Sequence, residues 1–167
     1  MVKPFKCPVQ PDMVHRRAAH SAIPTDCSSD ALTHLGEENP CIDQMLIKDL
    51  ITDLGEPYLV DLLTRLFRSA SEALAEMRNL HMKKDFAGAA MLAHRTAGST
   101  ALFGLKALHT GLLAYERAII DGKSSFGAQL LQVLPSVLAR TVASLQSCGD
   151  LRNLTRTTDM PPIVKKQ

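Results

Sequence analysis

The sequence contains no tryptophan and very few other aromatic residues, which restricts the kind of core it can form. Aromatic residues make up 4% of the 167 residues, whereas hydrophobic residues as a whole make up 46%. A core of this composition must be built from Leu, Ile, Val, Ala and Met, and it favours helices over a β-sandwich. The length fits one domain with tails.

The chain also lacks a strong charge imbalance, long apolar runs and paired cysteines. Its formal net charge is +2 and its basic residues are scattered, so we expect neither a nucleic-acid partner nor a membrane surface. No run approaches the roughly 18 apolar residues of a membrane span, and the first 30 residues lack the apolar stretch of a secretory signal, so we expect a cytoplasmic protein. The four cysteines form no Cys-x-x-Cys pair, which argues against a disulfide framework or a zinc site; they are Cys7, Cys27, Cys41 and Cys148.

Proline usage divides the chain into three parts. Five of the nine prolines fall in the first 40 residues, which show no sustained periodicity, so we expect residues 1–40 to be flexible. Residues 41–150 carry helical periodicity throughout and form the expected domain. Residues 151–167 contain Pro161 and Pro162 in a polar stretch and are expected to be a flexible tail.

The domain is expected to be all-α. Apolar spacing predicts helices near residues 42–54, 57–81, 84–102, 105–120 and 124–148, separated by short turns. Pro135 is expected to kink or interrupt the last of them. Short connections between long helices make neighbours antiparallel, so the sequence predicts an up-and-down antiparallel four-helix bundle with an additional short N-terminal helix.

The stretch 94–104 places one imidazole among small residues in the middle of a helix. The residues on the side of His94 are mostly small and uncharged, while the opposite side carries a plausible core stripe; that stripe is Ala89, Leu92, Ala93, Thr96, Thr100 and Phe103. From the residues alone, a core or incidental surface histidine is favoured over a functional one. The chemistry that suits an accessible histidine here is phosphoryl carriage, because neutral imidazole is a good nucleophile near pH 7.

The run 93–104 resembles the signature of histidine-containing phosphotransfer (HPt) domains. Ala93 is the small residue before the histidine, Gly98 and Ser99 follow four and five positions after it, and Gly104 follows ten after. The helical pattern then continues through Leu108, Leu112, Tyr115 and Glu116, and Phe67 occupies an upstream aromatic position of the family. The resemblance covers roughly residues 42–148.

The resemblance implies that His94 accepts a phosphoryl group from an aspartyl phosphate on a receiver domain and passes it to another receiver. Such domains are not enzymes by themselves and need no cofactor or metal, because the receiver supplies the bound Mg²⁺. The expected partners are response-regulator receiver domains, a hybrid histidine kinase, or both, and we expect a monomer. The expected phosphoryl-site and docking residues are Met91, Arg95, Ala97, Gly98, Ser99, Ala101 and Leu102.

One position departs from the family pattern. The family usually carries Lys three positions after the histidine, and this chain has Ala97 there. Arg95 projects about 100° round the helix, and the nearest lysines lie about 15–18 Å along the axis; they are Lys83, Lys84 and Lys106. A second hypothesis is therefore an HPt-like adaptor that binds a receiver or kinase without being phosphorylated. A helix pair from a histidine kinase is weaker, because Arg95 stands where an acid follows the histidine.

Three further residues are candidates for roles near the site. Glu116 is expected to be an ordinary exposed helical glutamate; the alternatives are that it orients a neighbouring helix or holds a charge near the site. His81 and His109 are expected to cap or line surfaces, because their spacing from His94 offers no metal-binding pair.

Overall fold

The computed structural model describes residues 41–147 and residue 151, and every element in this part of the chain is a helix. The helices are α2 (Gln44–Leu54), α3 (Glu56–Met82), α4 (Phe86–Leu102), α5 (Lys106–Ile120) and α6 (Ser124–Ser147). Their bounds differ from the expected ones by one or two residues. The all-α prediction is thus confirmed, whereas the expected flexible segment 1–40 lies outside the described residues.

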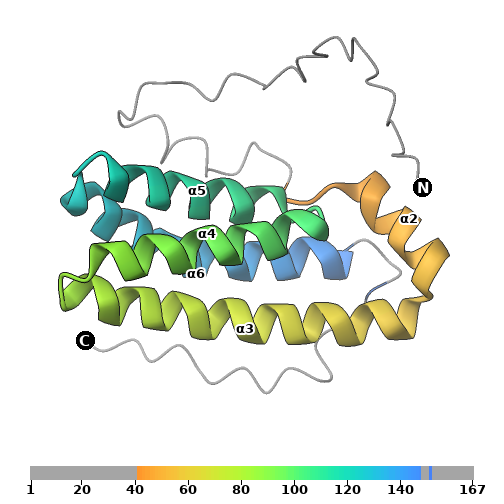
Figure 1. Ribbon diagram of the computed structural model, residues 1–167. Coiled ribbons are helices and arrows are strands. Elements are labelled where there is room, and N and C mark those ends of the chain that lie inside the picture. The colour runs from red at the N-terminus through yellow and green to blue at the C-terminus, as the bar shows by residue number, and fades with distance from the viewer. Residues whose placement is uncertain (1–40, 148–150, 152–167) are drawn as a thin grey trace, which may run out of the picture.

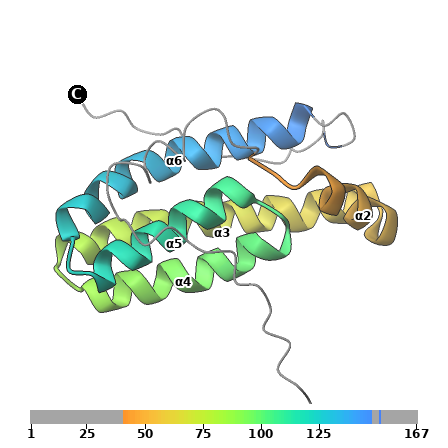
Figure 2. The same ribbon diagram turned by 90° about the horizontal axis from the view of Figure 1, so that it is seen from above.

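The four long helices lie side by side with α2 at one end (Figures 1 and 2). α4 packs against α3 and α5, α6 packs against the same two helices, and α2 contacts α3. The buried residues are almost all aliphatic, with Phe67 and Tyr115 as the aromatic members among the described residues, as the composition predicted. The Tyr115 hydroxyl shares a hydrogen bond of 3.1 Å with His81 Nδ1, and burial raises the pKa of Tyr115 to about 12.

The helix ends follow the local sequence. Asp43 and Asp85 cap α2 and α4, since their carboxylates accept hydrogen bonds from the backbone N–H three residues on. Gly55 ends α2 at a φ of +80°, a conformation that glycine adopts without strain, and Pro57 follows in the first turn of α3.

A second glycine joins α2 to the turn between α4 and α5. Gly104 has a φ of +63°, and a Cβ there would lie 2.9 Å from the Cβ of Asp43. Its carbonyl accepts from Asp43 N at 2.8 Å, and Lys106 forms an ion pair of 2.9 Å with Asp43. The start of α2 is therefore attached to the end of α4, the helix that carries His94.

Two expectations need correction. Pro135 does not interrupt α6, which runs unbroken from Ser124 to Ser147. The carbonyl of Leu131, which Pro135 deprives of its helical N–H donor, instead accepts hydrogen bonds from Arg78 Nε and Nη2 at 3.3 and 3.1 Å. Leu151, placed in the flexible tail by the sequence, is fully buried and belongs to the core.

By length and apolar composition, α6 is the one described helix that could span a membrane, and a helix in the core of a helical protein meets the same two criteria.

Candidate functional site

Helix α4 carries the site and is buried along one side only. Four members of the expected core stripe are buried, namely Ala89, Ala93, Thr96 and Thr100, while Leu92 and Phe103 are half-buried. This stripe faces the other helices and leaves His94 exposed, with 70% of its side chain accessible. His94 is therefore a surface histidine and not a core residue.

His94 is paired with a carboxylate on the neighbouring helix. Both carboxylate oxygens of Glu116, on α5, lie 3.1 Å from His94 Nδ1, and the Glu116 side chain is 20% exposed. An ionised carboxylate can only accept a hydrogen bond, so Nδ1 carries the proton and Nε2 of the neutral ring carries the lone pair. The pairing therefore makes Nε2, on the far side of the ring, the nucleophilic atom.

The expectation that Glu116 is an ordinary exposed glutamate is wrong, because its side chain is 20% exposed and contacts His94. Glu116 lies 22 residues after His94, and no local pattern joins the two positions. The signal that could have identified the pair is the short 103–105 turn, because it folds α5 back along α4 and brings one residue of α5 level with the imidazole.

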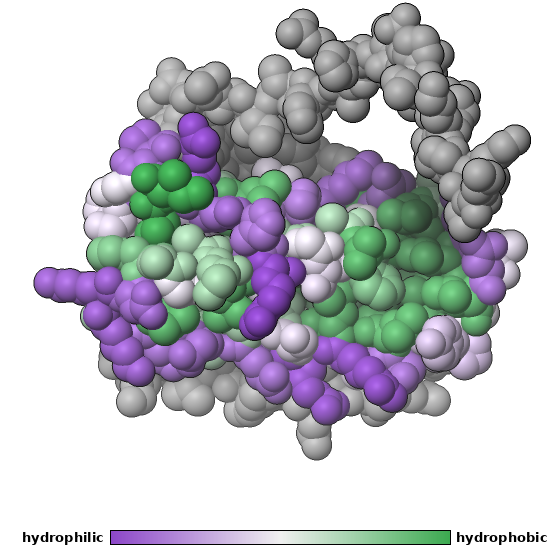
Figure 3. Space-filling model, viewed as in Figure 1, coloured by the Kyte–Doolittle hydropathy of each residue, from purple (hydrophilic) through white to green (hydrophobic). Residues whose placement is uncertain are grey.

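Apolar and small residues surround the imidazole on the exposed side of α4. Met91 and Leu102 are each 73% exposed, and Gly98 and Ala101 are exposed as well. A Cβ built on Gly98 meets no atom within 4 Å, so the surface one turn after His94 is open. Figure 3 shows apolar residues gathered along this face of the molecule, interrupted by polar ones. We name Met91, Gly98, Ala101 and Leu102 the docking patch.

Ala97 does not belong to this patch, contrary to the expectation. Its side chain is 1% exposed, and its carbonyl accepts a hydrogen bond from His109 Nδ1 of α5 at 3.0 Å. The buried arc of α4 is wider than the expected stripe because α5 covers one flank of the helix. A lysine at this position would have to run out between α4 and α5 to reach the imidazole.

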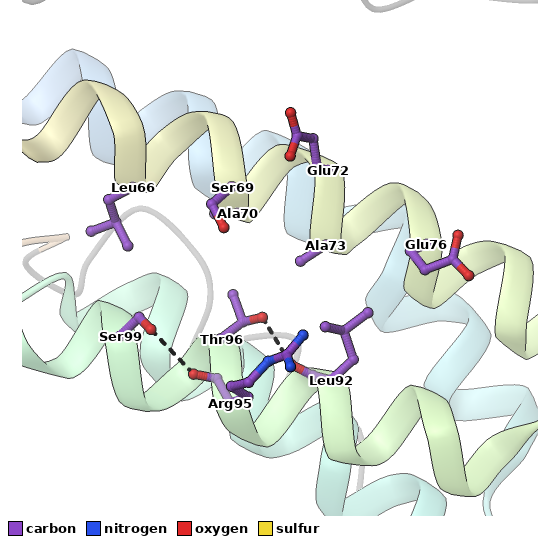
Figure 4. A pocket seen from close by; sticks show the side chains of 10 residues that line it. All are labelled: Leu66, Ser69, Ala70, Glu72, Ala73, Glu76, Leu92, Arg95, Thr96 and Ser99. Carbon is purple, nitrogen blue, oxygen red and sulfur yellow. Dashed lines mark hydrogen bonds between the residues drawn. The ribbon is translucent and has the colours of Figure 1, made fainter.

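Arg95 and Ser99 face a different surface from His94. Both line a groove between α3 and α4, shown in Figure 4. The Ser99 hydroxyl donates to the backbone carbonyl of Arg95 at 3.3 Å, a local bond within helix α4. The hydrogen bonds of the imidazole go to Glu116 and not to Arg95 or Ser99, so the predicted site divides into two adjoining surfaces of α4.

The described residues hold no cluster of three or more His, Cys, Asp or Glu side chains suited to a metal ion. Cys41 is a free thiol, and the other three cysteines lie outside the described residues. His81 and His109 are each half-buried, and their rings are hydrogen-bonded to the Tyr115 hydroxyl and the Ala97 carbonyl. The groups that can take part in chemistry beside the docking patch are the His94 imidazole and the Glu116 carboxylate.

Comparisons of the chain with protein-family models, with curated proteins and with solved structures find no significant match.

Proposed function

We propose that the chain is a phosphorelay intermediate of the HPt type, acting in the cytoplasm. In this proposal α3, α4, α5 and α6 form an up-and-down antiparallel four-helix bundle, and α2 is the additional N-terminal helix. Two features support the assignment: the resemblance over residues 93–104 and the exposed imidazole at the middle of α4. The protein is not an enzyme by itself and receives its phosphoryl group from a partner.

The observation that carries the proposal is the contact between His94 Nδ1 and Glu116. With the proton held on Nδ1, the Nε2 lone pair attacks the phosphorus of a receiver's aspartyl phosphate. The new P–N bond forms as the P–O bond to the aspartate breaks, and the aspartate leaves as a carboxylate. The ring gains positive charge during this step, and the Glu116 carboxylate stabilises that charge, as the acid of a catalytic triad does for its histidine.

The partner we propose is a receiver domain, free or within a hybrid histidine kinase. The docking patch offers it an apolar contact surface, and exposed apolar residues of this kind mark interaction sites. The receiver would bring the Mg²⁺ that aligns the transfer, and this chain would contribute position and the nucleophile.

A second candidate is an HPt-like adaptor that binds a receiver or kinase without phosphoryl transfer. The observation in its favour is Ala97, because no cation of α4 lies beside the imidazole to offset phosphoryl charge. Lys106 does not fill this role, since its ammonium is bound to Asp43. The adaptor would use the same docking patch and would not depend on His94.

The two candidates are separated by incubating the protein with receiver domains that carry radioactive aspartyl phosphate. We expect label on the wild-type protein that is stable in base and lost in acid, and no label on His94→Gln. The matched control is His109→Gln, which removes another histidine and should keep the label. Label on His94→Gln would exclude the proposal. Receiver binding that survives His94→Ala without any transfer would favour the adaptor.

A further inference from the structure

The groove between α3 and α4 is a second surface, separate from the docking patch. Its volume is about 400 Å³, and its lining residues are Leu66, Ser69, Ala70, Glu72, Ala73, Glu76, Leu92, Arg95, Thr96 and Ser99. Figure 4 shows Leu66 and Leu92 in the gap between the two helices, with Arg95 on the α4 side. The two leucines are half-buried, so the groove leaves aliphatic surface in contact with water.

The two rims of this α3–α4 groove carry opposite charges. Glu72 and Glu76 lie one helical turn apart on α3, and Arg95 stands on α4. Counted from the turn at Lys84, Arg95 is level with Ala73, between the two glutamates along the helix axis. The ion pairs within the described residues do not include Arg95, Glu72 or Glu76. The α4 rim therefore carries a positive charge and the α3 rim negative charges at the same height along the helices, and these charges are not paired with each other.

A surface of this kind is complementary to itself. Two copies can be related by a two-fold axis that lies in the interface and runs parallel to α3 and α4. This axis places α4 of one copy opposite α3 of the other and leaves every residue at the same height along the helices. Arg95 of each copy then faces Glu72 and Glu76 of the other, so the charges pair twice in one isologous contact. The guanidinium can bind a carboxylate with two parallel hydrogen bonds.

We propose that two copies of the chain associate through the α3–α4 groove, with Arg95 of each copy bound to Glu72 and Glu76 of the other. The proposed dimer differs from the monomer expected from the sequence. Helical periodicity shows which residues are charged, but it does not show that α3 and α4 form a groove with oppositely charged rims. The proposal goes beyond phosphotransfer and does not depend on it. Glu116 and the imidazole of His94 lie on the α5 side of α4, away from the groove.

Charge exchange tests the pairing directly. Analytical ultracentrifugation of the full chain over a concentration series should show a dimer for the wild type. Arg95→Glu and the double variant Glu72→Lys, Glu76→Lys should each raise the dimer dissociation constant about 100-fold, because like charges then face each other twice in every dimer. An equimolar mixture of these two variants should form a heterodimer, since both contacts in it again join unlike charges.

Three results would overturn the proposal. One is a wild-type chain that stays monomeric up to about 1 mM. Another is a dimer whose dissociation constant neither charge variant changes, which would place the contact elsewhere. The third is a mixture that remains monomeric although each variant is folded by circular dichroism. If a charge reversal unfolds the chain, Arg95→Gln and Glu72→Gln, Glu76→Gln weaken the same contacts and decide the question. His94→Gln is the control and should dimerise like the wild type.

Discussion

Gly98 has a position that the fold itself does not require. It lies inside α4, where glycine is about 1 kcal/mol less favourable than alanine. No atom lies within 4 Å of a Cβ built there, so neither a close contact nor a turn explains the missing side chain. The proposed docking of a receiver domain beside His94 would explain it. Under that proposal, the absence of a side chain at Gly98 lowers the stability of α4 and leaves room for the partner.

Gly98→Ala should therefore stabilise the protein by about 1 kcal/mol in urea unfolding while slowing phosphoryl transfer. Gly104→Ala is the matched control and should destabilise it, because the residue has a φ of +63° and its Cβ would lie 2.9 Å from that of Asp43. A Gly98→Ala variant that is less stable than the wild type would contradict this prediction, because it would mean that the space beside Gly98 is already occupied.

In the proposed phosphoryl transfer, Glu116 would fix the tautomer of the His94 ring without contacting the phosphorus. Glu116→Ala removes the acceptor for Nδ1–H, so the ring should lose its fixed tautomer and transfer should slow about tenfold, the effect of some 1.5 kcal/mol for a charge-assisted hydrogen bond. Nitrogen-15 NMR of the His94 ring measures the tautomer directly. Glu116→Gln can still accept this bond and should retain more of the tautomer than Glu116→Ala. An unchanged ring spectrum in Glu116→Ala would contradict this role.

At the scale of elements, α6 shows how a helix keeps a proline in its interior. Pro135 cannot donate to the Leu131 carbonyl, and Arg78 of α3 supplies the missing donors from outside the helix. The same contact joins α3 to α6, because the Leu131 carbonyl that lacks a donor within α6 is bound by a side chain of α3.

A double-mutant cycle measures this link. Arg78→Met keeps the aliphatic part of the side chain and removes the donors, so it should destabilise the protein by about 1 kcal/mol. In a Pro135→Ala background the helix supplies its own N–H to Leu131, and the effect of Arg78→Met should largely vanish. Urea denaturation of the four proteins gives the coupling energy. Additive effects would mean that Arg78 acts elsewhere.

At the scale of the whole molecule, Asp43 connects α2 to the rest of the fold and makes this connection sensitive to acid. The hydrogen bond from Lys106, together with that from Leu46 N, lowers the pKa of Asp43 from its ordinary value of 3.8. A lowered pKa in the folded state adds stability that is complete above the ordinary value. This stability is lost as the pH falls through the lowered pKa.

We therefore expect amide exchange in α2 to accelerate at low pH before exchange in α3 to α6 does. Asp43→Asn should keep the N-cap, since Asn caps helices well, but lose the ion pair and the acid sensitivity assigned to this carboxyl. Hydrogen exchange with mass spectrometry follows both proteins between about pH 5 and pH 2. Equal acid dependence in wild type and variant would contradict the assignment.

The helices and their ends were determined by the sequence alone, because they depend on local spacing and caps. Gly55 and Pro57 stand where α2 ends and α3 begins, and the carboxylates of Asp43 and Asp85 cap the starts of α2 and α4. The composition likewise determined an aliphatic core, and the residue pattern identified a buried stripe on α4, but it left open whether His94 is buried or exposed.

Only the tertiary structure decided what lies beside each face. Ala97 is buried because α5 covers that flank of α4, and Glu116 meets His94 because the same helix returns level with it. Arg78 reaches Leu131 across 53 residues of sequence, and Arg95 faces a groove that exists only where α3 and α4 pack. Helical periodicity defines which residues share a face, but the neighbour that each face meets depends on how the helices are arranged, which no local pattern contains.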